Sequence, residues 1–170
     1  MSQYFGKYRG MVLNNIDPMQ QGRLLVQVPD VTGLTPSTWA MPCVPFAGKQ
    51  MGMWVLPQIG AGVWVEFEQG NADFPIWVGC WWPSAGEVPV DALIPPPIPP
   101  SSHVVIQTAG QKTFLLSDTP GPLGGIVLKN ILGAKITITE LGITIDNGMG
   151  ASIQLLGPQV IINNGALVVI

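Results

Sequence analysis

Few residues of this chain have the type and spacing that catalysis needs. Glu66 and Glu68 stand two positions apart in an alternating segment, so a strand would place both carboxylates on one face. Glycosidase carboxylates instead face each other across a gap of roughly 5–9.5 Å. His103 has no nucleophile and carboxylate in a pattern that would complete a catalytic triad. We therefore interpret the glutamates as solvated strand residues and His103 as a surface or interface residue, and we predict no catalytic site.

Recognisable metal and cofactor motifs are also missing from the sequence. Cys43 and Cys80 are 37 residues apart, and with one histidine in the chain a four-ligand zinc site lacks ligands. We expect two buried free thiols, with a single disulfide as the alternative. The glycine-rich segment 121–125 lacks the Lys-Ser/Thr pair and the helix of a phosphate-binding loop, so it is interpreted as a turn. We predict neither a metal nor a cofactor.

The composition of the 170 residues excludes several classes of protein. Hydrophobic residues make up 47%, which is too many for a disordered chain. Only 10% are charged and the net charge is −3, whereas about a quarter charged is usual. Apolar runs are interrupted too often for a transmembrane helix, and the first residues lack the features of a signal peptide. With so few charges, much apolar surface is expected to contact another chain.

One sharp change in composition divides the chain. All six tryptophans, both tyrosines and four of the five phenylalanines precede residue 83. Residues 83–100 contain seven of the seventeen prolines, which favours an extended polyproline II segment. We therefore predict a first domain at 1–82, a proline-rich linker at 83–102 and a second domain at 103–170.

The first domain is predicted to be an all-β barrel. Alternating segments bounded by turn residues predict strands at 5–14, 22–28, 39–46, 62–68 and 74–80, with turn-rich loops at 14–18 and 29–33. Five short strands suit a small closed barrel such as the OB-fold. Three sets of residues are each expected to share one strand face: Leu24, Val26 and Val28; Val63, Val65 and Phe67; Phe74, Ile76 and Val78.

Some OB-folds bind single-stranded nucleic acid by stacking bases on aromatic side chains. Trp77, Trp81 and Trp82 could stack in this way, but no Lys or Arg lies between Lys49 and Lys112. Without an electrostatic groove this function is disfavoured. We interpret the tryptophans as packing residues at the barrel base or at a trimer interface.

The second domain is predicted to be a β-solenoid or β-prism. Glycines at 133, 142, 150, 157 and 165 separate short β-branched segments with a period of about eight. Thr137, Thr144 and Gln154 are expected on one face. The residues expected on the other face are Ile136, Ile138, Ile143, Ile145, Ile153, Leu155, Val160 and Ile162.

A single narrow sheet would leave these eight aliphatic side chains exposed to water. Each would forgo roughly 1.5–3 kcal/mol of burial free energy. Identical chains around a symmetry axis can cover such faces without open edges. We therefore predict a homotrimer that forms a three-sided prism, with these eight residues as its core.

The end of the chain is unusually apolar. The 24 residues after Asp146 contain no charged side chain, and the chain ends Leu167-Val168-Val169-Ile170. Chain termini are ordinarily polar and frayed. We expect this last segment to be locked into the prism, or to form a tip that another protein covers.

Several of these segments resemble a known family. Residues 22–28, 57–71 and 74–79 resemble the OB-fold of phage baseplate assembly protein V and of the Vgr spikes of type VI secretion. Residues 142–148 and 157–160 are similar to the triple-stranded β-helix of these spikes. The resemblance implies a non-enzymatic central spike of a contractile injection machine, with its barrels on the hub and its needle toward the target envelope.

The resemblance also implies partners and a location. A large N-terminal hub domain is missing, so a separate hub protein is expected, and a PAAR-like tip protein and the target membrane are possible contacts. Only the proline-rich segment separates barrel and needle, which leaves no room for a lysozyme domain, and the end lacks the His-x-His of metal-holding tips. Assembly is expected in the bacterial cytoplasm, into a phage tail, a bacteriocin or another injection particle. A trimeric fibre or adhesin that binds a surface glycan is the alternative.

Overall fold

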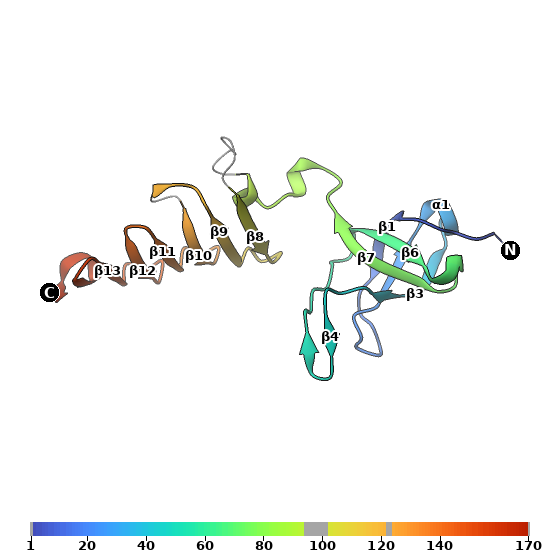
Figure 1. Ribbon diagram of the computed structural model, residues 1–170, viewed down its shortest axis with the longest axis horizontal. Helices are drawn as coiled ribbons and strands as arrows, with labels where there is room; N and C mark the ends of the chain where they lie inside the picture. The colour runs from blue at the N-terminus through green and yellow to red at the C-terminus, as the bar shows by residue number, and fades with distance from the viewer. Residues whose placement is uncertain (1, 94–101, 122–123, 170) are drawn as a thin grey trace. The chain divides into compact units, whose positions relative to one another are not determined.

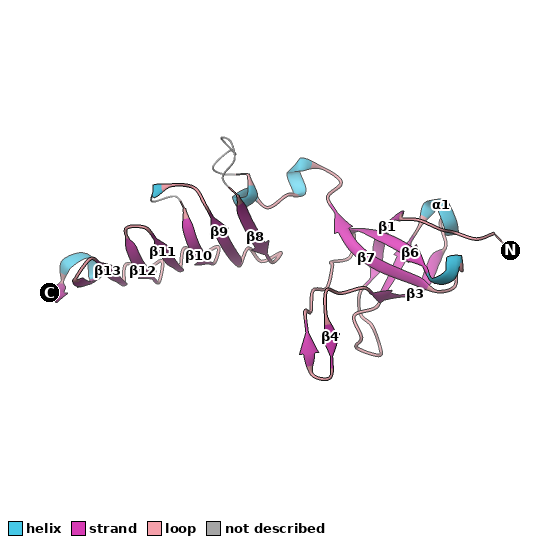
Figure 2. Cartoon of the chain, viewed as in Figure 1, coloured by secondary structure: helices cyan, strands magenta, loops and turns pink. Residues whose placement is uncertain are grey.

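The computed structural model describes residues 2–93, 102–121 and 124–169. It divides the chain into two compact units, residues 1–87 and 88–170 (Figure 1). Strands dominate both units, and helical segments are short (Figure 2). Most of the predicted proline-rich linker, residues 94–101, lies outside the described residues.

Unit 1 is a closed barrel, which confirms the predicted all-β fold. Its five strands run in the order β1-β2-β3-β7-β6. Neighbours pair antiparallel, except that β3 and β7 are parallel. The strands are β1 (Tyr8–Asn14), β2 (Leu24–Gln27), β3 (Pro36–Pro42), β6 (Gly62–Phe67) and β7 (Pro75–Trp81).

The barrel interior is filled by small and medium aliphatic side chains. Two of the predicted faces are confirmed, because alternate residues of β2 and of β6 point inward. The buried core consists of Val12, Leu24, Val26, Val28, Ala40, Val63, Val65, Phe67 and Trp77. Closure of the sheet on itself lets these residues leave water without a partner chain.

The apolar set predicted on the last barrel strand, Phe74, Ile76 and Val78, does not belong to the buried core. Pro75 and Trp77 point into the core, whereas Phe74 is 58% exposed. Both alternating sets along this segment are apolar, so periodicity alone could not choose between them. The pairing of β6 with β7 shifts register at Trp64/Val65 and places Val65 opposite Trp77. The indole N–H of Trp77 donates to the carbonyl oxygen of Gly22 at 3.1 Å, so its burial leaves no unpaired donor.

Other local expectations also need correction. The predicted loop at 29–33 contains a single helical turn, α1 (Pro29–Thr32), which starts at a proline and ends at Gly33. A small hairpin, β4 (Ala47–Gly48) and β5 (Met51–Gly52), follows β3 and was not predicted. Cys43 and Cys80 are free as expected, but both are exposed rather than buried.

A charged cluster holds the loop between β1 and β2. The Asp17 carboxylate accepts hydrogen bonds from the backbone N–H groups of Met19, Gln21 and Arg23 at 2.8–3.2 Å. The Arg23 guanidinium donates to the same carboxylate at 2.7 and 3.0 Å and lies 5.5 Å from the ring centre of Trp39. The hydrogen bonds from Arg23 are the main reason that the pKa of Asp17 is held well below its usual range.

Unit 2 is one antiparallel sheet in which each strand pairs with its neighbours along the chain. Between β14 and β15 lies a short turn, η5 (Asn163–Gly165). The eight strands are β8 (His103–Gln107), β9 (Thr113–Ser117), β10 (Gly125–Lys129), β11 (Lys135–Thr139), β12 (Gly142–Asp146), β13 (Ser152–Leu156), β14 (Gln159–Ile162) and β15 (Leu167–Val169).

A short helical turn, η3 (Val90–Ala92), is attached to this sheet. Asp91 forms an ion pair with Lys129 of β10 at 2.7 Å. Nε2 of His103, at the start of β8, lies 2.8 Å from the carbonyl oxygen of Ala92. The second unit therefore begins before the first strand of its sheet.

The Asp17 cluster makes the stability of the barrel depend on pH. Because the folded chain keeps Asp17 deprotonated to lower pH than the unfolded chain does, protonation favours unfolding as the pH falls below about 4. We expect Asp17→Asn to lower the urea midpoint of the barrel at pH 7. The difference from the natural chain should narrow from about pH 5 to about pH 2.

Tryptophan fluorescence can follow this unfolding, since all six tryptophans lie between residues 39 and 82. Asp30→Asn, at an exposed aspartate of α1, is the matched control. Equal midpoints at pH 7 for Asp17→Asn and the natural chain would contradict a stabilising role of the cluster.

Candidate functional site

One face of the unit 2 sheet carries two unbroken rows of apolar side chains, here called the apolar face. Each row takes one residue from every strand, and successive members are direct cross-strand partners. The first row is Ile106, Phe114, Leu128, Ile136, Ile145, Ile153, Ile162 and Leu167. The second row is Val104, Leu116, Ile126, Ile138, Ile143, Leu155, Val160 and Val169.

The two rows contain all eight residues that the sequence predicted on one side. The opposite face bears Thr137, Thr144 and Gln154, which pair across β11, β12 and β13. The predicted division of residues between the faces is therefore confirmed. Packing of the eight residues in a trimer core stays a prediction, because a single chain contains no partner to cover them.

Sequence reasoning missed the rows on the first three strands. Val104 and Ile106 of β8, and Ile126 and Leu128 of β10, extend the apolar face ahead of the glycine repeat. Each of these segments has three consecutive apolar residues, at 104–106 and 126–128, so alternation does not show which of them share a face. The loops between these strands are irregular in length, so the period of about eight does not reach them.

The apolar face is uncovered in the single chain. None of its residues is buried, and Ile145, near the middle of the first row, is 47% exposed. A single layer of strands has nothing to pack against on this side. Exposed contiguous apolar surface of this extent marks an interaction site.

Repeated loops keep the strands in register. The side-chain oxygen of Asn130 accepts hydrogen bonds from the backbone N–H groups of Leu132 and Ala134 at 2.9 and 3.1 Å. Asn147 repeats this with Met149 and Ala151 at 2.8 and 3.0 Å. An asparagine side chain therefore stabilises each of these two loops, which lie at the same end of the strands.

The two loops also approach each other closely. A Cβ atom at Gly148, where φ is +72°, would lie 2.7 Å from the backbone of Gly133. Both loops share the pattern Asn-x-x-Gly-Ala, at 130–134 and at 147–151, but Gly148 lies outside the positions that they share. Only glycine fits at Gly148 without moving the neighbouring loop.

The predicted tip residues form the last strand. Leu167 and Val169 continue the two apolar rows, and Val168 points to the opposite face. All three are exposed, and Ile170 lies outside the described residues. Among the described strands, β15 pairs with β14 alone, so its other edge has no strand beside it.

The residues considered for catalysis are not brought together. Glu66 forms an ion pair with Lys7, whereas Glu68 begins η1 (Glu68–Gly70) after the strand has ended, so the two do not share a strand face. His103 lies in the other unit. Within residues 2–93, 102–121 and 124–169, three or more His, Cys, Asp or Glu never cluster as metal ligands would.

Two of the three tryptophans considered for base stacking are engaged in contacts within the barrel. Trp77 is 5% exposed, and the indole N–H of Trp81 donates to the carbonyl oxygen of Val63 at 3.2 Å. The guanidinium of Arg9 lies 5.0 Å from the ring centre of Trp81 and 5.7 Å from that of Trp64. Only Trp82 of the three is exposed.

No helix in the described part of the chain is long and apolar enough to cross a membrane.

Ile145→Asp tests the apolar face. An unpaired carboxylate in a buried apolar contact costs several kcal/mol, so we expect the variant to lose self-association. Light scattering should give three times 18.1 kDa, about 54 kDa, for the natural chain and a smaller or heterogeneous mass for the variant. Thr144→Asp, on the opposite face of the same strand, is the control and should keep the mass. An Ile145→Asp trimer with unchanged heat resistance would place Ile145 outside the interface.

Two family models match separate parts of the chain. Residues 8–82 match the family model of the type VI secretion system/phage-baseplate injector OB domain. Residues 103–168 match the model of the phage baseplate V C-terminal trimerisation domain. No curated protein matches the chain. Because the two models together span most of the sequence, the chain belongs to the phage baseplate V family.

Proposed function

We propose that this baseplate protein is the central spike of a contractile injection machine, in which the unit 2 sheets of three chains form a needle that pierces the target envelope. The observation that carries the proposal is the pair of apolar rows that continues across all eight strands. The OB domain and the trimerisation domain of the family support a baseplate role in a phage tail or injection particle.

Three copies can complete the fold that one copy leaves open. If the apolar faces of three sheets turn toward a common axis, each covers the others, and Thr137, Thr144 and Gln154 face water. Burying an aliphatic side chain contributes about 1.5–3 kcal/mol, and each chain offers two rows of them. The result would be an intertwined β-prism whose core runs its full length.

The proposed action is mechanical rather than catalytic. A prism in which every strand is hydrogen-bonded to its neighbours resists bending, and its small cross-section concentrates the force of a contracting sheath on a small area of membrane. The barrels would attach the spike to a separate hub protein. Assembly would take place in the bacterial cytoplasm before the particle acts on its target.

The proposal is tested in a particle-producing strain that lacks this chain. Thr144→Asp should restore injection or killing close to the level of the natural chain, because its side chain faces water. Ile145→Asp should lower the titre by at least about tenfold, because a loss of several kcal/mol far exceeds the 1.4 kcal/mol that corresponds to a factor of ten. Full activity of particles that carry Ile145→Asp would contradict a needle built on the apolar face.

The exposed last strand supports a contact at the needle end, and we propose that a tip protein docks there. Deletion of residues 166–170 removes β15 and leaves seven paired strands. We expect the trimer mass to be kept, and binding of a tip protein and injection to be weakened. A pull-down in which the truncated spike retains its tip protein at full strength would show that docking lies elsewhere. Loss of the trimer would show that β15 belongs to the needle core.

A further inference from the structure

The barrel carries an exposed apolar arm. The arm consists of residues 45–55 and includes the β4–β5 hairpin, which stands away from the barrel strands (Figure 1). Every residue of the arm is exposed, and five of them are large and apolar. These are Phe46 (54% exposed), Met51 (63%), Met53 (43%), Trp54 (66%) and Val55 (55%). The arm therefore adds nothing to the buried core of its own barrel.

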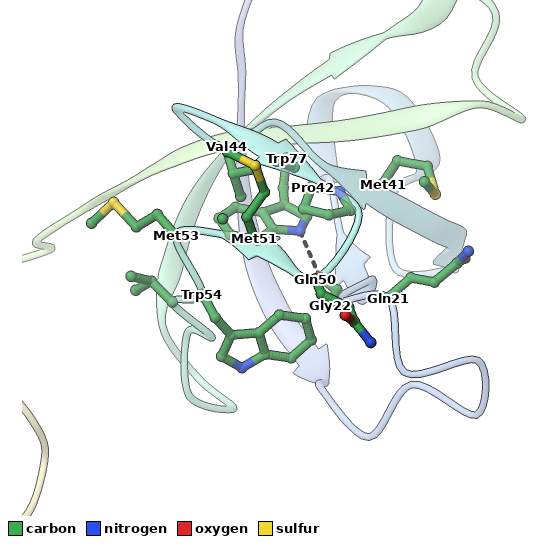
Figure 3. Close-up of a pocket in the computed structure, with 13 residues that line it drawn as sticks. Gln21, Gly22, Met41, Pro42, Val44, Gln50, Met51, Met53, Trp54 and Trp77 are labelled. Carbon is green, nitrogen blue, oxygen red and sulfur yellow. Dashed lines mark hydrogen bonds between the residues drawn. The ribbon is translucent and has the colours of Figure 1, made fainter.

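A hollow of about 480 Å³ lies between the arm and the barrel wall. Met51, Met53 and Trp54 of the arm line it together with Met41 and Trp77 of the barrel (Figure 3). These thioether and aromatic side chains give it an apolar surface that suits apolar side chains of a partner.

The walls of the hollow are held by specific contacts. A Cβ atom at Gly22 would lie 3.3 Å from the Trp54 ring, so the indole rests on the backbone of this glycine. The indole N–H of Trp77 donates to the carbonyl oxygen of the same residue (Figure 3). The hollow is therefore preformed, which lowers the entropy that a partner would lose on binding.

The surface of the arm is almost without charge. Between Asp30 and Glu66 the sequence contains a single charged residue, Lys49. Each chain has a net charge of −3, so identical chains repel each other least through uncharged surfaces of this kind. This favours a second copy of the chain as the occupant.

Trimerisation supplies the proximity that such a contact needs. Residues 82–89 connect β7 with η3, which is held to the sheet of unit 2 by the Asp91–Lys129 ion pair. Short linkers raise the effective concentration of tethered domains to the millimolar range. Barrels joined to one trimer can therefore associate through a contact that would be too weak for free barrels.

We propose that the arm and hollow of one barrel pack against the barrel of the neighbouring copy in the trimer. Around a threefold axis such a contact is heterologous, since each barrel offers its arm to one neighbour and a different surface to the other. The spike would then have two separate interfaces, one through the apolar face of the sheet and one through the barrels. This inference rests on the trimer of the proposed function.

Methionine oxidation of the purified full-length protein, with no other protein present, tests the contact. In the single chain Met51 and Met19 are both 63% exposed, and Met53 and Met11 are both 43% exposed. If a neighbouring barrel covers the arm, dilute hydrogen peroxide should oxidise Met51 and Met53 at least several-fold more slowly than Met19 and Met11. Peptide mass spectrometry measures each site.

An arm variant separates this contact from the trimer itself. Met51→Arg should keep a mass of about 54 kDa, because the sheets still associate, but Met53 should then oxidise as fast as Met11. Met19→Arg is the control and should leave Met53 protected. Equal oxidation of the matched pairs in a trimer of the natural chain would overturn the inference while leaving the trimer intact. Protection that appears only after a hub protein is added would also overturn it, as would a monomeric mass.

Discussion

The constraint on which the rest of this protein depends is that a single layer of strands cannot bury its own apolar face. The strands of unit 2, from β8 to β15, each pair antiparallel with their neighbours along the chain. It leaves two rows of apolar side chains without cover, with Ile145 at 47% exposed near the middle of the first row. Association of copies would cover these rows, in agreement with the match of residues 103–168 to a trimerisation domain.

The barrel solves the same problem without a partner. Its sheet closes on itself, so Leu24, Val26 and Val63 are fully buried within one chain. Asp17 and Arg23 hold the loop between β1 and β2, and Trp77 is buried with its indole N–H paired. The chain therefore joins a barrel that buries its own core to a sheet whose apolar face is left uncovered within one chain.

Much of the functional surface could be predicted from the sequence. The alternation of Ile136, Ile138, Ile143 and Ile145 with threonines showed which side chains share a face, because side chains in a strand alternate with a strict period of two. The glycine repeat located the turns of the later strands. The earlier part of the apolar face, such as Ile106 on β8, escaped because the loops before β11 do not follow the repeat.

The sequence by itself determined the all-β fold, the strands after residue 133 and the apolar side of the sheet that they form, since each follows from local spacing. The tertiary structure decided which side of β7 is inside, because Phe74 and Trp77 belong to opposite faces that are both apolar, and the register with β6 selects between them. It also showed that Cys43 and Cys80 are exposed and that residues 45–55 form an arm. Burial depends on which segments distant in the chain come together, and neither hydropathy nor spacing records those contacts.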